Sequence, residues 1–197
     1  MKLKKHIFPP AFFLAGITSF LVGCSKVDKK FLITDSSVGL LTRGTKITQL
    51  DSLYQKDSLV KTSLEGEFRY ISEERFLIYE RGKEKKQLLE LTPNIPLDGS
   101  PQYIQGVQVL DDRYTTKEGI SLNSTFGDIK KVYKEFDFEQ LLSTVIVMPK
   151  GSNLYFAFDQ KELLPALDDT YTIESIPDTA KVKRLLLNWA EGTPPTQ

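Results

Sequence analysis

The fold is predicted from two stretches, Thr45-Lys-Ile47-Thr-Gln-Leu50-Asp-Ser-Leu53-Tyr54 and Ser124-Thr-Phe126-Gly-Asp-Ile129-Lys-Lys-Val132-Tyr133. The second follows the first at a constant offset of about 79 residues, which indicates a weak internal repeat. In both stretches apolar residues recur at positions that share one face of a helix. They are Ile47, Leu50, Leu53 and Tyr54 in the first stretch and Phe126, Ile129, Val132 and Tyr133 in the second. Each stretch is therefore predicted to form a short helix.

Hydroxyl residues stand at the predicted start of both helices. Thr45 has this position in the first stretch, and Ser124 or Thr125 has it in the second. Their side-chain oxygens are suited to accept hydrogen bonds from the first free backbone N–H groups of a helix. Asp128 falls in the first turn of the second helix, where negative charge is favourable.

The segments after each predicted helix have the composition of strands, rich in aromatic and β-branched residues. The predicted strands are residues 67–71, 75–79, 87–91 and 103–110, then 144–148, 154–158 and 181–189, the last of which is also long enough for a helix. Residues 82–86 and 149–153 are the predicted hairpin turns. The predicted fold class is α+β, with two similar helix-plus-antiparallel-sheet halves at 31–110 and 111–190.

The first 23 residues have the pattern of a secretory signal peptide. Lys2, Lys4 and Lys5 precede an apolar run that ends in Leu21-Val22-Gly23-Cys24. An uncleaved membrane helix is the less favoured interpretation, because Pro9-Pro10 interrupts the run and leaves it shorter than the roughly 20 residues that a bilayer requires. An ordinary buried cysteine is a second alternative.

The tetrapeptide Leu21-Val22-Gly23-Cys24 resembles a bacterial lipobox. This resemblance implies removal of residues 1–23, attachment of a lipid to the Cys24 sulfur, and acylation of the new N-terminus with palmitate or a similar chain. Residues 24–30 are then a flexible tether, and 191–197 have the composition of a disordered tail. Ser25 is not the aspartate that, by family resemblance, retains lipoproteins at the inner membrane. The expected location is therefore the outer membrane.

The composition excludes several classes of site. His6 is the only histidine and Cys24 the only cysteine, and both positions are accounted for by the leader and the lipid. No cysteine or histidine metal site, thiol nucleophile or histidine-based triad is expected, and no cofactor is predicted. The chain has 26 basic and 26 acidic residues, and three lysines leave with the leader, so no nucleic-acid partner is expected.

The candidate chemical groups are pairs of adjacent carboxylates. They are Asp111-Asp112, Asp168-Asp169 and Glu73-Glu74. Glycoside hydrolysis needs two converging carboxyl groups, whereas adjacent residues on a strand point to opposite faces. Solvated loop charges are the favoured interpretation. The segment after Asp168 lacks the spacing of a calcium loop, so no metal site is predicted.

Aromatic residues form the second group of candidates. Helical spacing favours core packing for Phe126 and Tyr133, and core packing is also favoured for Phe136 and Phe138, over a platform for sugar or peptide. Trp189, the only tryptophan, is left with two interpretations: it closes the sheet edge or it marks a contact surface. The charged run 83–86 is interpreted as a hairpin tip rather than a basic binding patch.

Gly44 followed by Leu50, Leu53 and Tyr54 resembles the glycine-then-helix motif of small outer-membrane assembly lipoproteins and of the secreted β-lactamase inhibitor proteins. The second copy departs from the motif, with Asn123 in place of glycine. This resemblance implies tandem modules that bind proteins through a concave sheet. Residues 114–125 also resemble a segment of uncharacterised lipoproteins from Bacteroidetes-type bacteria.

The predicted function is that of a lipid-anchored, non-catalytic cell-envelope protein, with the membrane as one partner through Cys24 and an unidentified protein as another. No catalytic residue is predicted, and the binding residues stay unassigned. The alternative is a carboxylate-dependent glycan hydrolase or carbohydrate-binding lipoprotein, which needs an acidic cleft with exposed aromatic residues. A structural spacer without an apolar surface patch is the third possibility.

Overall fold

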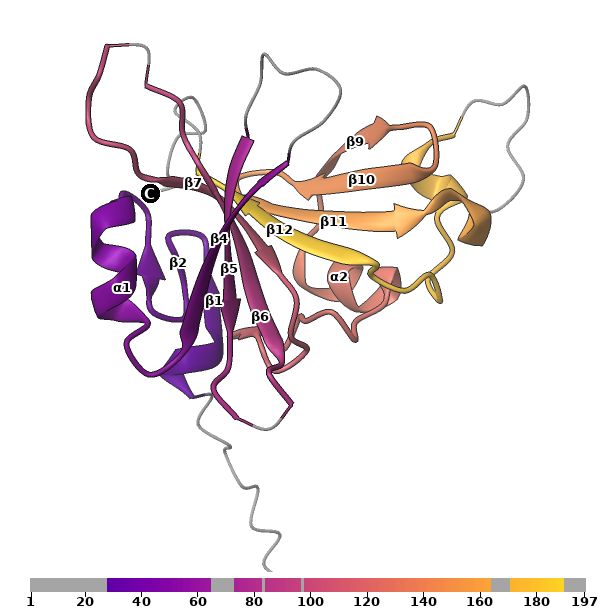
Figure 1. Ribbon diagram of the computed structural model, residues 1–197. Coiled ribbons are helices and arrows are strands. Elements are labelled where there is room, and N and C mark those ends of the chain that lie inside the picture. Colours follow the sequence, from indigo (N-terminus) through magenta and orange to yellow (C-terminus); the bar gives the residue numbers. More distant parts are fainter. Residues whose placement is uncertain (1–27, 65–72, 83, 97, 164–170, 190–197) are drawn as a thin grey trace, which may run out of the picture.

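The computed structural model describes residues 28–64, 73–82, 84–96, 98–163 and 171–189 (Figure 1). The predicted signal peptide with its predicted lipobox and Cys24, the predicted strand 67–71, the Asp168-Asp169 pair and the predicted tail lie outside the described residues. Within the described part, no helix has the length and apolar character needed to cross a membrane.

An antiparallel sheet of eight strands dominates the molecule, in the order β4-β5-β6-β7-β12-β11-β10-β9 (Figure 1). Its strands are β4 (Ser58–Leu64), β5 (Glu73–Tyr79), β6 (Gln87–Pro93), β7 (Ile104–Val109), β9 (Phe136–Gln140), β10 (Thr144–Pro149), β11 (Leu154–Asp159) and β12 (Arg184–Asn188). Adjacent strands in the first four, and again in the last four, are consecutive along the chain. Strand β12 returns to pair with β7, with Leu187 opposite Val107 and Leu185 opposite Val109.

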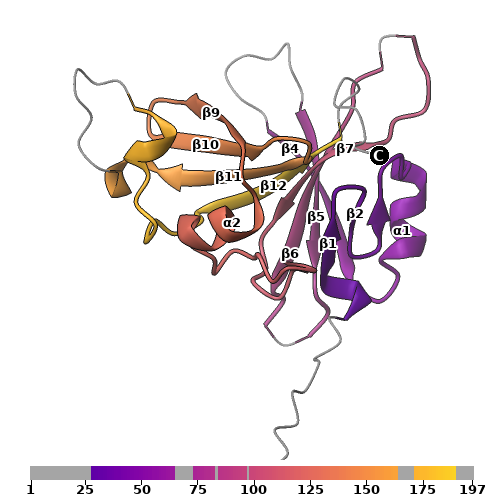
Figure 2. The same cartoon turned by 180° about the vertical axis from the view of Figure 1, so that it is seen from behind.

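A smaller sheet of four short strands lies at the start of the described chain, in the order β3-β2-β1-β8. Its strands are β1 (Leu32–Thr34), β2 (Ser37–Val38), β3 (Leu41–Thr42) and β8 (Thr115–Thr116). The β1 and β8 strands are parallel, which attaches the N-terminal segment to the loop after β7. Figure 2 shows β1 and β2 beside β5 and β6 of the large sheet.

One face of the large sheet is buried. Alternate residues of its strands, such as Ile78, Leu89, Val109 and Phe156, are fully inaccessible and belong to one hydrophobic cluster. The same cluster contains Ile33 of the small sheet, which shows that this sheet covers the buried face. Strand alternation therefore decides which side chains enter the core.

Two short helices complete the cover of that face. The helix α1 (Leu50–Leu53) follows the 3₁₀ turn η2 (Ile47–Gln49), and α2 (Phe126–Val132) lies behind β12 in Figure 1 and in front of it in Figure 2. Thr125 caps α2 and exchanges hydrogen bonds with Asp128, as predicted for one of the two hydroxyl candidates. Thr45 is not a helix cap, because its hydroxyl donates to the carbonyl oxygen of Thr42.

The predicted fold class is wrong. The molecule is mainly β structure, with two sheets and helices of only four and seven residues, and it does not consist of two helix-plus-sheet halves. The sequence pattern located both helical stretches, but the strands after them join through the β7 and β12 pair into one continuous sheet. The small sheet was not predicted at all.

The turn between β1 and β2 ties the small sheet to the end of the large one. The backbone carbonyl of Asp35 accepts hydrogen bonds from Asn153 Nδ2 at 3.0 Å and from Trp189 Nε1 at 2.9 Å. The Asp35 carboxylate also accepts bonds from Ser152 and from the Asn153 backbone. These contacts hold segments more than a hundred residues apart in a fixed arrangement.

Candidate functional site

The second face of the large sheet is the candidate functional surface. Alternation places polar and apolar side chains there that are only partly covered, and no described element belonging to the core cluster lies over them. We call this surface the open face. Its half-buried apolar members are Leu77, Ile146, Met148, Tyr155 and Leu186, with the more exposed Val60 at the β4 edge.

A hollow of about 280 Å³ lies in the middle of the open face. Gly106 forms part of its floor, between Thr92 of β6 and Asn188 of β12. A Cβ atom on Gly106 would approach the Thr92 Cβ to 3.3 Å, so the absence of a side chain there keeps the hollow open. Tyr155, Leu186 and Ile146 line its side on β10 to β12.

Polar groups line the opposite side of this hollow. Arg75 Nη1 donates hydrogen bonds of 3.0 Å to Glu90 Oε1 and to Thr92 Oγ1. These bonds fix the guanidinium across β5 and β6, because a cation held by two neighbouring strands has little rotational freedom. The hollow therefore combines an apolar wall with fixed polar groups, which is the composition of many binding surfaces.

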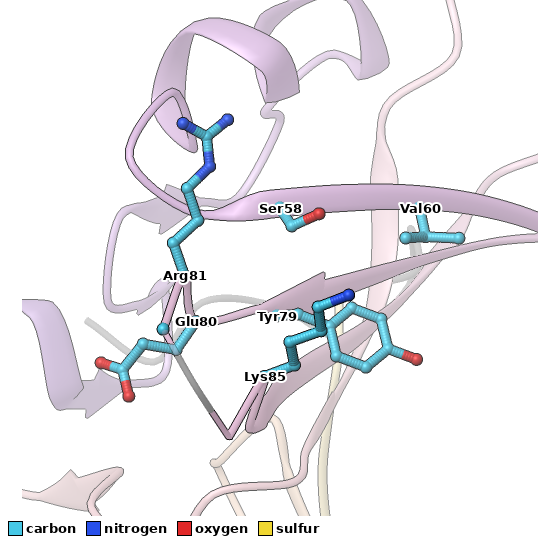
Figure 3. A pocket seen from close by; sticks show the side chains of 7 residues that line it. Ser58, Val60, Tyr79, Glu80, Arg81 and Lys85 are labelled. Atoms are coloured by element: carbon cyan, nitrogen blue, oxygen red, sulfur yellow. The ribbon is translucent and has the colours of Figure 1, made fainter.

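A second pocket of about 500 Å³ lies at one end of the open face, where β5 leads into β6 (Figure 3). Ser58 and Val60 contribute to it from β4, Tyr79 from the end of β5, and Lys85 from the connection between β5 and β6. In Figure 3, Tyr79 and Lys85 lie next to each other across from Val60, whereas Arg81 and Glu80 extend in different directions. Lys85 has a positive φ of 43°, which shapes this turn.

An ion-pair network adjoins the second pocket. Arg113 Nη2 lies 2.7 Å from Asp111 Oδ2 and 2.8 Å from Glu80 Oε2, and its guanidinium lies over the Phe31 ring. Lys86 Nζ lies 3.2 Å from Asp111 Oδ2. Burial alone would raise the pKa of Asp111, but hydrogen bonds from Arg113 and Lys86 lower it to about 2. Asp111 is thus an ionised, fully paired carboxylate.

The network also affects its neighbours. The hydrogen bond that Arg113 donates to Glu80 lowers the pKa of Glu80. Lys30 Nζ contacts both Glu80 and the buried Asp57. Burial raises the pKa of Tyr54, whose hydroxyl has no hydrogen-bond partner in the described residues. The charges of Glu80 and Asp57 are thus compensated by cations, and the Tyr54 hydroxyl stays uncharged, as expected for a network that stabilises the fold.

Among the described side chains, the carboxylates singled out from the sequence do not form a reactive pair. Asp111 is inaccessible, while the half-exposed Asp112 is held by Lys86 and by Asn123 Nδ2. Glu74 pairs with Lys61 at the β4 edge. Within the described part of the chain, no three carboxylate, histidine or cysteine side chains converge on a position that could hold a metal ion.

The aromatic candidates pack into the protein, as the sequence predicted. Phe126 is inaccessible and contacts Phe136 and Phe158, and the half-buried Tyr133 and Phe138 pack against the core. Trp189 is inaccessible, so it does not mark a contact surface, and it follows the central strand β12, so it does not close the sheet edge either. Its indole N–H donates to the Asp35 carbonyl oxygen, which gives it a structural role between the two sheets. None of these rings lies on the open face.

The residues of the open face were missed by sequence reasoning. Ile146 and Leu186 alternate with buried residues of β10 and β12, so the strand period was a usable signal. That period does not say which of the two faces stays uncovered, because the cover comes from the distant small sheet and α2. The hollow at Gly106 depends on six strands and has no local sequence signature.

Comparison with known proteins supports the fold alone. No protein-family model and no curated protein matches the sequence. Among solved structures, the crystal structure of the uncharacterized protein YfeY from Escherichia coli is similar, with a TM-score of 0.51 and 14% sequence identity. The similarity covers 79% of this chain and 98% of that one. The arrangement of strands is therefore shared by an existing protein at very low sequence identity.

Proposed function

We propose that this chain is a lipid-anchored, non-catalytic protein of the cell envelope that binds another protein through the open face of its large sheet. Cys24 supplies the anchor in this proposal, and the outer membrane is the expected location. The observation that carries the binding role is the uncovered sheet face, with half-buried apolar side chains around a hollow. Partly exposed apolar groups beside fixed polar ones are typical of protein interfaces.

The geometry of the open face favours a protein over a small molecule. Its hollow extends over β5, β6, β7, β12, β11 and β10, and its apolar wall is formed by the aliphatic and aromatic side chains of Ile146, Leu186 and Tyr155. A sheet surface with such a hollow suits an inserted side chain of a partner, with the surrounding strands excluding water. Tyr155 is the residue best suited as an anchor, since tyrosine is enriched at the centres of interfaces.

The glycan hypothesis receives no support from the groups on which it depended. Asp111 is buried in an ion-pair network, and the candidate rings Phe126 and Phe136 face the core. Asp168 lies outside the described residues. Glycan binding is therefore retained only as an outcome that the experiment below distinguishes.

The test is crosslinking in intact cells followed by isolation of the tagged full chain and mass spectrometry. The wild type is compared with Leu186→Glu, which places a charge on the open face, and with Leu142→Glu as the matched control. Leu142 is fully exposed in the β9 to β10 turn, so its exchange leaves the open face unchanged. We expect one recurrent protein whose recovery falls about tenfold or more in the Leu186 variant only.

Two further comparisons make the result decisive. A Cys24→Ala form shows whether the partner is captured only from the membrane, and a thermal melt of each variant shows whether it is folded. Equal recovery of the partner by the wild type and the folded Leu186 variant would contradict binding at the open face. Enrichment of glycan without a stoichiometric protein would support the alternative function.

A further inference from the structure

The described chain begins at one particular end of the molecule. The 3₁₀ turn η1 (Lys29–Phe31) lies against the connection between β5 and β6, because Lys30 Nζ contacts Glu80 Oε1 at 3.8 Å. The Phe31 ring packs under the Arg113 guanidinium at 4.4 Å and against Tyr114. Figures 1 and 2 both show this start of the chain next to the loop that joins β5 and β6.

Covalent geometry limits how far this end can lie from Cys24. Four peptide links separate Cys24 from Asp28, and even a fully extended chain advances only about 3.5 Å per residue. A lipidated Cys24 is held at the membrane surface. Asp28 must then lie within roughly 14 Å of that surface, and the β5 to β6 connection lies at the same end of the molecule.

The exposed charges at this end are mostly positive. Four carboxylates, Glu80, Asp57, Asp111 and Asp112, pair with three cations, Lys30, Lys86 and Arg113, in the network described above, which leaves one negative charge in excess. Four further cations lack a partner among the described residues: Lys29, Lys56, Arg81 and Lys85. Against them stand Asp28, which caps η1, the exposed Glu84 and the one negative charge that the network leaves in excess. We call these four cations the basic end.

Lys56 belongs to this end although it is distant from the hairpin in sequence. It precedes Asp57, which pairs with Lys30, and Ser58, which is opposite Tyr79 in the sheet. The basic end therefore draws on the N-terminal turn, the start of β4 and the β5 to β6 connection. Its cations come from three segments that the fold brings to one surface.

We propose that the basic end faces an anionic lipid surface and fixes how the protein is oriented on the membrane. This inference rests on the proposed lipidation of Cys24. A short tether confines the basic end near the headgroups, where each cation adds attraction that falls off within a Debye length. The open face then runs away from the bilayer along β5 to β10 and stays accessible to a partner.

The test uses the fact that Cys24 is the only cysteine. The wild-type full chain and two variants, Glu84→Cys at the basic end and Ile95→Cys after the far end of β6, are purified from membranes and treated with a thiol-reactive fluorophore. Both positions are exposed, and β6 separates them by roughly 20 Å. The labelled chains are reconstituted into vesicles that carry nitroxide headgroups and contain either phosphatidylglycerol or only phosphatidylcholine.

We expect quenching at position 84 to be about threefold stronger than at position 95 in anionic vesicles, and to weaken with added salt. Reversal of two cations, Arg81→Glu with Lys85→Glu, should abolish this difference. The control reversal, Lys161→Glu with Lys181→Glu, should leave it unchanged, because these exposed lysines lie beside β11 and β12.

The outcomes separate the two proposals. Labelling of the wild-type chain would show a free Cys24 thiol, which overturns the anchor and with it this orientation. An unlabelled wild type with equal quenching at positions 84 and 95 overturns the orientation but leaves the anchor intact. If the difference in quenching between positions 84 and 95 is the same in neutral and in anionic vesicles, the role of the four cations is overturned.

Discussion

Asp111 shows why a carboxylate that looks reactive in the sequence has a structural role here. Its side chain is inaccessible, and its oxygens accept hydrogen bonds from the Arg113 side chain and backbone. A buried carboxylate is stable only when its charge is matched, and removal of one partner leaves the other uncompensated. The network therefore joins the loop after β7 to the β5 to β6 connection and to the chain start.

The depressed pKa of Asp111 gives a pH dependence of folding stability. Because its pKa is about 2 in the folded protein, its stabilisation is present above the ordinary carboxyl pKa and is lost as the pH falls toward 2. We expect Asp111→Asn to lower the free energy of unfolding at pH 7 by on the order of 1 to 2 kcal/mol. Between pH 4 and pH 2, the wild type should lose that much more stability than the variant. Urea unfolding at a series of pH values measures both.

Asp112→Asn is the matched control, since Asp112 is half exposed and its ion pair with Lys86 is accessible to water. Exposed pairs contribute little, so its unfolding midpoint should stay close to that of the wild type. A parallel pH response of the wild type and Asp111→Asn would show that the network does not hold Asp111 ionised.

At the scale of elements, α2 and most strands of the large sheet were predictable, whereas its edge strands β4 and β9 and the assembly were not. Strands β6, β7, β10 and β11 lie where alternation and composition placed them, and β12 is a strand because Leu185 and Leu187 alternate into the core. The small sheet has strands of two or three residues, too short to show a period. The β7 and β12 pairing is non-local, and no spacing along the chain indicates it.

The turn between β2 and β3 depends on Gly39. This residue has a φ of 57°, and a Cβ atom there would overlap the Lys30 carbonyl oxygen. We expect Gly39→Ala to lower the free energy of unfolding by about 2 to 4 kcal/mol. The loss comes from the strain of a left-handed alanine and from a clash with backbone, which cannot move away as a flexible side chain could. The measurement is the midpoint and slope of chemical unfolding.

Gly44 is the natural control for this element. Its φ of 85° is also left-handed, but no atom lies within 4 Å of its Cβ position. Gly44→Ala should therefore cost only the strain of about 1 kcal/mol. If Gly39→Ala and Gly44→Ala lowered the free energy of unfolding equally, the close packing of η1 against Gly39 would contribute nothing. The left-handed backbone conformation would then explain the loss in both variants.

At the scale of the whole molecule, the eight-stranded sheet should unfold as one unit. Trp189 connects its parts: its backbone N–H donates to Gln105 next to β7, and its side chain donates to Asp35 of the small sheet. The hydrophobic cluster likewise runs from Ile33 through both sets of four strands. A core shared in this way predicts a single cooperative transition, whereas two independent halves would predict two.

The sole tryptophan makes this testable, because its fluorescence reports on the β12 end while far-ultraviolet circular dichroism reports on all strands. Ile78 lies on β5, three strands away from β12, and is inaccessible. We expect Ile78→Val to lower the unfolding free energy by about 1 kcal/mol and to shift both midpoints equally. A fluorescence midpoint that stays in place while the dichroism midpoint falls would show that the β12 side folds independently. In that case the β7 and β12 pairing would be a contact between separate units, and the open face would not be a rigid surface for a partner.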